Sequence, residues 1–282
     1  MKQHRIISNS KVIGIFIQIF VVVLISLTFV SNSYSACRKI VSLAPSITET
    51  LFYLGLGKNI IGVTRYAEWP KAVKKIAKIG GYYDPNIKLI VKLAPDVLFL
   101  TYHQRQIISE LKKLDINYKL LRFDTTGKLA GSVRAIGRIC NRNDLAKKVI
   151  KRMNKEMSAV KKLCSKGRKK TALLIMGNRF PVTVAGSQTF MSQMLPLLSM
   201  KNAYSGKIAW PQIPLENIVQ LNPDYLFIIS VKKRTAGSDL LSLLNIMTVK
   251  KKQIVYLTGQ RYFIDSPRIT EIFLQTAKKL CR

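Results

Sequence analysis

Two stretches of the chain match each other: residues 87–96 read IKLIVKLAPD, and residues 215–224 read LENIVQLNPD. Their apolar positions coincide at one constant offset, and each stretch ends in a Pro-Asp pair before a continuous apolar run. Proline ends a helix because it lacks a backbone N–H group, and a continuous apolar run suits a strand that is covered on both faces. The sequence therefore predicts a helix, a turn and a buried strand that are repeated in two lobes.

Short strands and helices alternate along the rest of the chain. Apolar runs rich in β-branched residues predict strands at residues 40–43, 60–63, 97–100, 118–123, 172–176, 182–184, 225–229 and 254–257. Amphipathic stretches predict helices at residues 46–56, 107–114, 188–198, 215–221, 239–247 and 269–280. This alternation is typical of α/β lobes with mainly parallel sheets.

One long amphipathic pattern over residues 129–163 separates the two sets of elements. We therefore predict an α/β fold in which two lobes with mainly parallel sheets are joined by one long α-helix. The predicted boundaries are an N-terminal lobe over residues 37–127, a linking helix over residues 128–166 and a C-terminal lobe over residues 167–282.

The N-terminal residues have the features of an export signal. Lys2, Arg5 and Lys11 flank an apolar run over residues 12–30, and small polar residues follow. This pattern predicts a signal peptide over residues 1–36 and a periplasmic protein. An uncleaved membrane anchor is the alternative, because the apolar run is about as long as the ~20 residues that span a bilayer. Lipidation at Cys37 is less favoured, because Tyr34 stands where a lipoprotein signal would have Leu.

The chain is strongly basic, with 47 Lys and Arg against 14 Asp and Glu and a net charge of +33. The basic residues are scattered in short clusters and are not interleaved with aromatic residues, which argues against a nucleic-acid partner. Binding to a surface polyanion is a less favoured alternative. The chain has no G-x-S-x-G, P-loop or H-E-x-x-H motif and only two histidines, so we do not expect an enzyme.

The four cysteines are Cys37, Cys140, Cys164 and Cys281. Disulfides persist in exported proteins. On a continuous helix, Cys140 and Cys164 would lie about 36 Å apart, so they would not pair with each other. Buried thiols and one or two bridges both remain open, as does the pairing. The cysteine and histidine spacings of zinc sites are absent, so no metal site is expected.

Several short motifs occur in order along the chain: VSLAPSITE at residues 41–49, IGVT at 61–64, WP at 69–70, LAPD at 93–96, WPQ at 210–212, NPD at 222–224 and SPR at 266–268. Together they resemble the periplasmic substrate-binding proteins of ABC importers for vitamin B12, ferric siderophores and haem, over essentially residues 38–281. The resemblance implies a class III binding protein with its ligand between the lobes. It also implies a monomer without a cofactor that delivers the ligand to a permease and its ATPase.

The likeness is greatest to the vitamin B12-binding members, so cobalamin is the expected ligand, with a ferric siderophore or haem as the alternative. The aromatic residues of their cleft match Tyr66, Tyr82 and Trp210 here, with Phe180 as a looser match. Flat aromatic faces suit a large corrin ring. An acid and an arginine near the ligand's edge are replaced here by Gln260 and Ile264, so Gln260 is expected to keep only part of a polar contact.

Other residues near the expected cleft favour anionic ligands. Arg65, Lys207 and Arg261 would attract haem or a ferric siderophore. His103 follows a predicted strand, where open α/β sheets gather ligands, and haem takes an axial histidine or tyrosine. A single histidine is more often an ordinary surface residue.

The family pattern also implies one acidic residue on each lobe that meets an arginine of the permease. Glu216 matches it in the second lobe, but Lys88 occupies the matching position in the first. A lysine would repel an arginine, so either the permease differs at this position or a neighbouring acid such as Asp84 substitutes.

Overall fold

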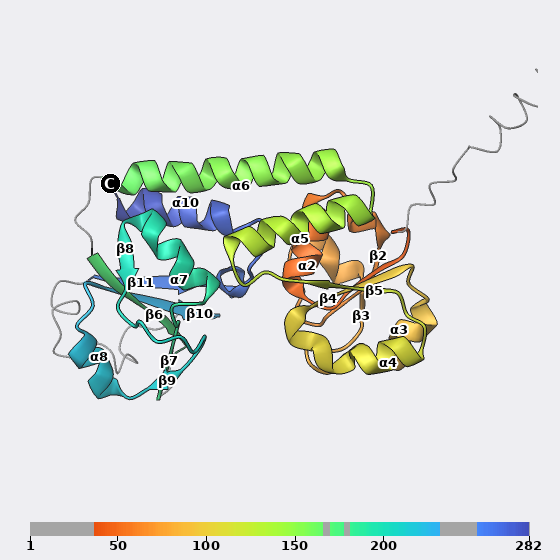
Figure 1. Cartoon of the computed structure of the whole chain (residues 1–282), viewed down its shortest axis with the longest axis horizontal. Coiled ribbons are helices and arrows are strands. Elements are labelled where there is room, and N and C mark those ends of the chain that lie inside the picture. Colours follow the sequence, from red (N-terminus) through yellow and green to blue (C-terminus); the bar gives the residue numbers. More distant parts are fainter. Residues whose placement is uncertain (1–36, 166–169, 178–180, 232–252, 282) are drawn as a thin grey trace, which may run out of the picture. The chain divides into compact units, whose positions relative to one another are not determined.

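The computed structural model describes residues 37–165, 170–177, 181–231 and 253–281 (Figure 1). The predicted signal peptide, the predicted helix over residues 239–247 and Phe180 lie outside the described residues. Within the described part of the chain, no helix has the length and apolar character needed to span a bilayer.

The first lobe is built on a five-stranded sheet in which every pair of neighbouring strands is parallel. Its order is β3-β2-β1-β4-β5. The strands are β1 (Ile40–Ser42), β2 (Ile60–Val63), β3 (Ala77–Lys78), β4 (Val97–Thr101) and β5 (Tyr118–Leu121), and the helices between them are α2 (Pro45–Tyr53), α3 (Ile87–Leu93) and α4 (Ile108–Lys113). Strand β4 is buried along its whole length, as its continuous apolar run predicts.

The second lobe is built on a six-stranded sheet with the order β11-β10-β6-β7-β9, and β8 also pairs with β6. The strands are β6 (Lys170–Met176), β7 (Val182–Val184), β8 (Met200–Asn202), β9 (Gln212–Ile213), β10 (Tyr225–Ser230) and β11 (Ile254–Thr258), with helices α7 (Phe190–Met194), α8 (Leu215–Leu221) and α10 (Ile269–Leu280). Strand β7 pairs antiparallel with both β6 and β9, and the other pairs among these strands are parallel. The α/β fold with two mainly parallel sheets is confirmed.

The prediction of one continuous helix over residues 128–166 is wrong. The chain forms two helices there, α5 (Thr126–Ile139) and α6 (Asn143–Cys164). Asn141 turns the chain between them with φ of 53°, a left-handed conformation that asparagine tolerates better than most residues. Both helices bury apolar side chains in the same core, so the amphipathic pattern continues across the break. Helix α6 alone makes the long connection between the lobes (Figure 1).

The matching stretches fold in the same way in both lobes. Asp96 Oδ2 accepts hydrogen bonds from the backbone N–H groups of Arg38 and Lys39, both at 2.8 Å, just before β1. Asp224 Oδ2 accepts a hydrogen bond from the backbone N–H of Thr171 at 2.7 Å, at the start of β6. In each lobe, the aspartate that precedes one strand therefore holds the beginning of its parallel neighbour.

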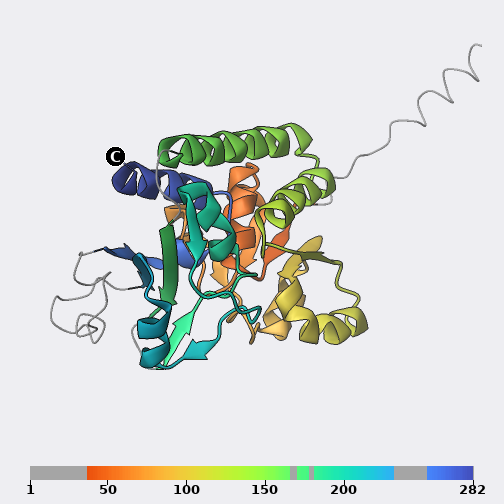
Figure 2. The ribbon, with the colours of Figure 1, turned by 60° about the vertical axis from the view of Figure 1, so that its left-hand side comes forward.

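Two disulfides join all four cysteines, Cys37 with Cys140 and Cys164 with Cys281. Cys140 and Cys164 do not pair with each other, although the continuous helix from which we expected this is broken between them. The choice between bridges and free thiols is resolved in favour of two bridges. The second bridge ties the end of α10 to the end of α6, and these helices lie side by side (Figures 1 and 2).

Removing the Cys164–Cys281 bridge with the double replacement Cys164→Ala and Cys281→Ala should cost about 2–5 kcal/mol of unfolding free energy, because the bridge closes a long loop in the unfolded chain. The sequence separation of the two cysteines is 117 residues. Guanidinium unfolding followed by circular dichroism measures the loss. An unchanged midpoint under oxidising conditions would show that the bridge does not stabilise the fold.

Candidate functional site

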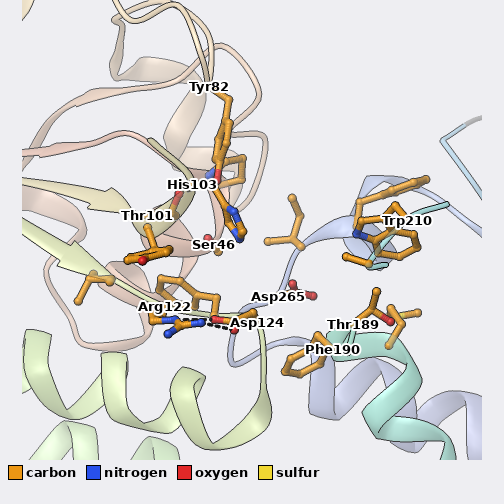
Figure 3. Close-up of a pocket in the computed structure, with 18 of the residues that line it drawn as sticks. Ser46, Tyr82, Thr101, His103, Arg122, Asp124, Thr189, Phe190, Trp210 and Asp265 are labelled. Atoms are coloured by element: carbon orange, nitrogen blue, oxygen red, sulfur yellow. Dashed lines mark hydrogen bonds and ion pairs between the residues drawn. The ribbon is translucent and has the colours of Figure 1, made fainter. Parts of the chain in front are cut away.

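A cavity of about 650 Å³ opens between the two lobes (Figure 3). In the first lobe its walls come largely from residues that follow β1, β2, β4 and β5, at the carboxyl edge of the parallel sheet. Open α/β sheets bind ligands at this edge because loops and helix starts converge there. The first lobe contributes Pro45, Ser46, Tyr66, Tyr82, Tyr83, Thr101, Tyr102, His103, Leu121, Arg122, Phe123 and Asp124. The second contributes Gln188, Thr189, Phe190, Met191, Lys207, Ala209, Trp210, Phe263, Ile264 and Asp265.

Tyr66, Tyr82 and Trp210, which the sequence singled out, all line this cavity. Tyr82 and Trp210 lie on opposite walls (Figure 3). The Tyr82 hydroxyl lies 2.5 Å from Thr101 Oγ1, and burial raises the pKa of Tyr82, so the phenol stays neutral at physiological pH. Trp210 is 39% exposed although it is a large apolar side chain, which leaves its ring accessible from the cavity.

Gln260 is not among the cavity-lining residues. Its side-chain amide instead donates a hydrogen bond of 2.8 Å to the backbone carbonyl of Tyr66, so it joins the second lobe to the first. Ile264, Lys207 and His103 line the cavity.

Arg65 and Arg261 are not among the lining residues either. The Arg65 guanidinium forms an exposed ion pair with Asp84 at 2.5 Å. Arg261 packs over the neighbouring Tyr262 ring. Of the three cations that the sequence placed near the cleft, only Lys207 therefore reaches the cavity.

Sequence reasoning missed a charged group at the end of β5. Arg122 and Lys128 both bind the carboxylate of Asp124, at 2.9 and 2.7 Å. Burial raises the pKa of Asp124, but the hydrogen bonds from Arg122 and Lys128 outweigh this and lower it to about 2. Arg122 and Arg105 also lie over the ring of Tyr102, at 4.9 and 4.2 Å. The available signal was Asp124, which directly follows the strand predicted over residues 118–123; Arg122 lay inside that predicted strand, which ends at Leu121 in the structure.

Sequence reasoning also missed Asp265, which lies between the two walls of the cavity (Figure 3). Its carboxylate makes no hydrogen bond or ion pair with any residue that the structure describes. Burial and the nearby Asp124 together raise the pKa of Asp265 to about 7. The cavity therefore contains one carboxyl group whose charge the described protein does not neutralise.

A second inter-lobe contact involves two of the sequence motifs. Glu49 of α2 is 3% exposed and pairs with Arg268, and the Ser266 hydroxyl donates a hydrogen bond to the same carboxylate. The Arg268 guanidinium also lies 4.7 Å from the ring centre of Trp69. We call Glu49, Trp69, Ser266 and Arg268 the latch. The WP and SPR motifs thus contribute to a contact between the lobes and are not among the residues that line the cavity.

The cavity has the properties of a binding site for a large, partly apolar ligand. Aromatic and aliphatic side chains dominate its walls, and a few polar groups converge on it. In the described part of the chain, no group of three or more His, Cys, Asp or Glu residues is arranged to hold a metal ion.

Comparison with known proteins identifies the family. A family model described as periplasmic binding protein matches residues 40–260. The chain is 30% identical over 197 residues to the uncharacterized ABC transporter substrate-binding lipoprotein YvrC of Bacillus subtilis. That alignment covers 66% of this chain and 62% of the Bacillus protein, which is under two thirds of its length.

The chain is also 22% identical over 204 residues to a vitamin B12-binding protein of Photorhabdus laumondii, over 71% of this chain and 74% of the relative. Among solved structures, a possible iron-binding (periplasmic solute-binding) protein from Staphylococcus epidermidis matches with a TM-score of 0.74 and 24% identity, over 87% of this chain and 99% of the other. The structural match supports the two-lobed fold. The family model covers most of the chain and shows that the chain belongs to the periplasmic binding protein family.

Proposed function

We propose that this chain is the substrate-binding subunit of an ABC importer and that it captures cobalamin between its lobes. The observation that carries the proposal is the cavity between the lobes, with Tyr82 and Trp210 on opposite walls. Aromatic rings bury a large area with few rotamers to fix, so they suit a flat macrocycle. The chain binds and releases its ligand without bond chemistry, and the ligand's metal is cargo.

Haem or a ferric siderophore is the second candidate, and one observation favours haem. His103 lines the cavity on the same wall as Tyr82 (Figure 3). An imidazole or a phenolate can ligate haem iron axially. Cobalamin remains the first candidate because the curated relatives include vitamin B12-binding proteins.

We also propose a location and partners for the chain. Residues 1–36 serve as a signal peptide, so the mature protein is periplasmic, and it works as a monomer with a permease and its ATPase. Glu216 of α8 and Lys88 of α3 are proposed to face the permease. Both side chains are exposed, and each is the second residue of its helix.

Isothermal titration of residues 37–282 with cyanocobalamin, haemin and a ferric siderophore tests the proposal. These residues form one compact unit that contains both disulfides. We expect cyanocobalamin to bind with a Kd below about 10 μM, which corresponds to about −7 kcal/mol. If none of the three ligands binds at that level, metal-chelate capture is wrong; tight binding of haemin alone would favour the second candidate.

Trp210→Ala should weaken cyanocobalamin binding about 10–100-fold, because a stacked aromatic anchor typically contributes a few kcal/mol to binding. The matched control is Tyr256→Ala, which removes an aromatic residue that is 44% exposed and lies outside the cavity. The same titration should give wild-type affinity for this control. Equal affinities for the two variants would show that Trp210 does not contact the ligand.

A further inference from the structure

Asp265 lines the cavity, and the stacking of a ligand between Tyr82 and Trp210 gives it no role. It lies between Trp210 on one side of the cavity and the ion pair of Arg122 with Asp124 on the other (Figure 3). Apolar side chains that line the same cavity include Phe190, Phe263 and Ile264. Asp265 is half-buried, and a ligand that fills the cavity would displace water from its carboxylate, which costs free energy unless the ligand supplies a hydrogen-bond donor.

The other charged groups at the cavity do not supply that donor. Arg122 and Lys128 are bound to Asp124, which itself repels a charge on Asp265. Lys207 lines the cavity but forms no ion pair with Asp265 within 4.0 Å in the described structure. The remaining titratable groups of the cavity are His103 and the four tyrosines Tyr66, Tyr82, Tyr83 and Tyr102, and none of them hydrogen-bonds Asp265.

Because of Asp265, the polar groups of the cleft differ from those that the family resemblance implies. Gln260 and Ile264 stand where the family resemblance implies an acid and an arginine. Gln260 is engaged with the Tyr66 carbonyl, and Ile264 brings no charge into the cavity. Asp265 therefore provides an acid in the cleft that pairs with no arginine of the described structure, so a ligand carboxylate placed against it would meet repulsion.

We propose that Asp265 accepts a hydrogen bond from an N–H group of the bound ligand and so selects chelates that carry amides over chelates that carry carboxylates. This inference rests on the proposed function and names the ligand chemistry of the same cavity. Cobalamin carries primary amides around its ring, whereas haem carries two propionates. A hydrogen bond from an amide to an ionised carboxylate is stronger than one between neutral groups.

The ionisation of Asp265 determines the direction in which ligand affinity changes with pH. Asp265 must be ionised to act as a charged acceptor, and its pKa of about 7 leaves it mostly protonated at pH 6 and mostly ionised at pH 8. Affinity for an amide-bearing ligand should therefore rise with pH. If only the ionised form binds well, the affinity at pH 8 should be about tenfold higher than at pH 6.

The test is isothermal titration of residues 37–282 at pH 6 and pH 8 with cyanocobalamin and with a monocarboxylic acid derivative in which one ring amide is hydrolysed. We expect the wild type to bind cyanocobalamin about tenfold more tightly at pH 8 than at pH 6, and to bind the acid derivative at least tenfold more weakly than cyanocobalamin at pH 8. Asp265→Asn should lose both differences. Asp144→Asn, an exposed acid of α6 outside the cavity, should keep both.

The imidazole of His103 lines the same cavity, so His103→Gln separates its effect on binding from that of Asp265. The tenfold rise should persist in this variant; if it disappears there and survives in Asp265→Asn, the inference is wrong. Cyanocobalamin binding by Asp265→Asn that matches the wild type at both pH values would overturn the inference and leave cobalamin capture intact. Failure of the wild type to bind cyanocobalamin would overturn both.

Discussion

Glu49→Ala is expected to lower the free energy of unfolding by about 3–5 kcal/mol, because it leaves the arginine of the latch without its partner. The Glu49 carboxylate is almost fully buried, and Arg268 contacts both of its oxygens. Ser266 also loses its acceptor. The replacement therefore removes a buried hydrogen-bonded ion pair at the place where the second lobe meets α2. Urea unfolding followed by circular dichroism measures the loss.

Two controls separate this effect from a general loss of charge. Asp144→Ala removes an exposed ion pair with Lys147 and should change the stability by no more than about 1 kcal/mol. The double replacement Glu49→Leu and Arg268→Met should cost less than Glu49→Ala alone, because no unpaired charge remains buried. If Glu49→Ala and Asp144→Ala have equal small effects, the latch does not hold the lobes together.

Glu216→Lys is expected to reduce ligand uptake by cells at least tenfold while ligand affinity stays unchanged. Loss of one partner of a charge pair at an interface typically costs about 2–5 kcal/mol. Glu216 is exposed in the first turn of α8 and does not line the cavity, so its replacement should leave capture intact. Uptake of radiolabelled cyanocobalamin measures delivery, and isothermal titration with the purified protein measures capture.

Lys88→Glu is the matched variant on the first lobe. It places an acid at the equivalent second position of α3, where the family resemblance implies one. With a permease that carries arginine on both subunits, uptake should rise; with a permease adapted to Lys88, uptake should fall.

Asp84 pairs with Arg65, so Asp84→Asn tests whether Asp84 substitutes for the acid that is missing at position 88. Unchanged uptake in Glu216→Lys and Lys88→Glu would show that these helices do not contact the permease.

The sequence predicted the lobes well because local patterns specify them. The repeated helix and Pro-Asp turn correspond to α3 and α8, and Asp96 and Asp224 hold the neighbouring strands in the same way. The break between α5 and α6 was missed because both helices bury apolar faces in one core, so the periodicity shows no interruption. A single asparagine with positive φ, Asn141, makes the turn, and an asparagine alone is a weak turn signal.

The candidate site was only partly predictable. Tyr66, Tyr82 and Trp210 were found through the family pattern, and all three line the cavity. Asp265 was missed because its environment depends on residues that are distant in sequence, such as Asp124. Trp69 belongs to the latch, and that role depends on Arg268, far along the chain. Contacts between the lobes decide both roles, and local sequence patterns do not report such contacts.

A crystal structure of residues 37–282 with bound cyanocobalamin would show whether the chain captures this ligand between its lobes. We predict electron density for one corrin ring in the cavity, in contact with Tyr82 and Trp210 and with an amide nitrogen within hydrogen-bond distance of Asp265. Cyanocobalamin bound elsewhere on the protein, with this cavity free of it, would contradict capture between the lobes.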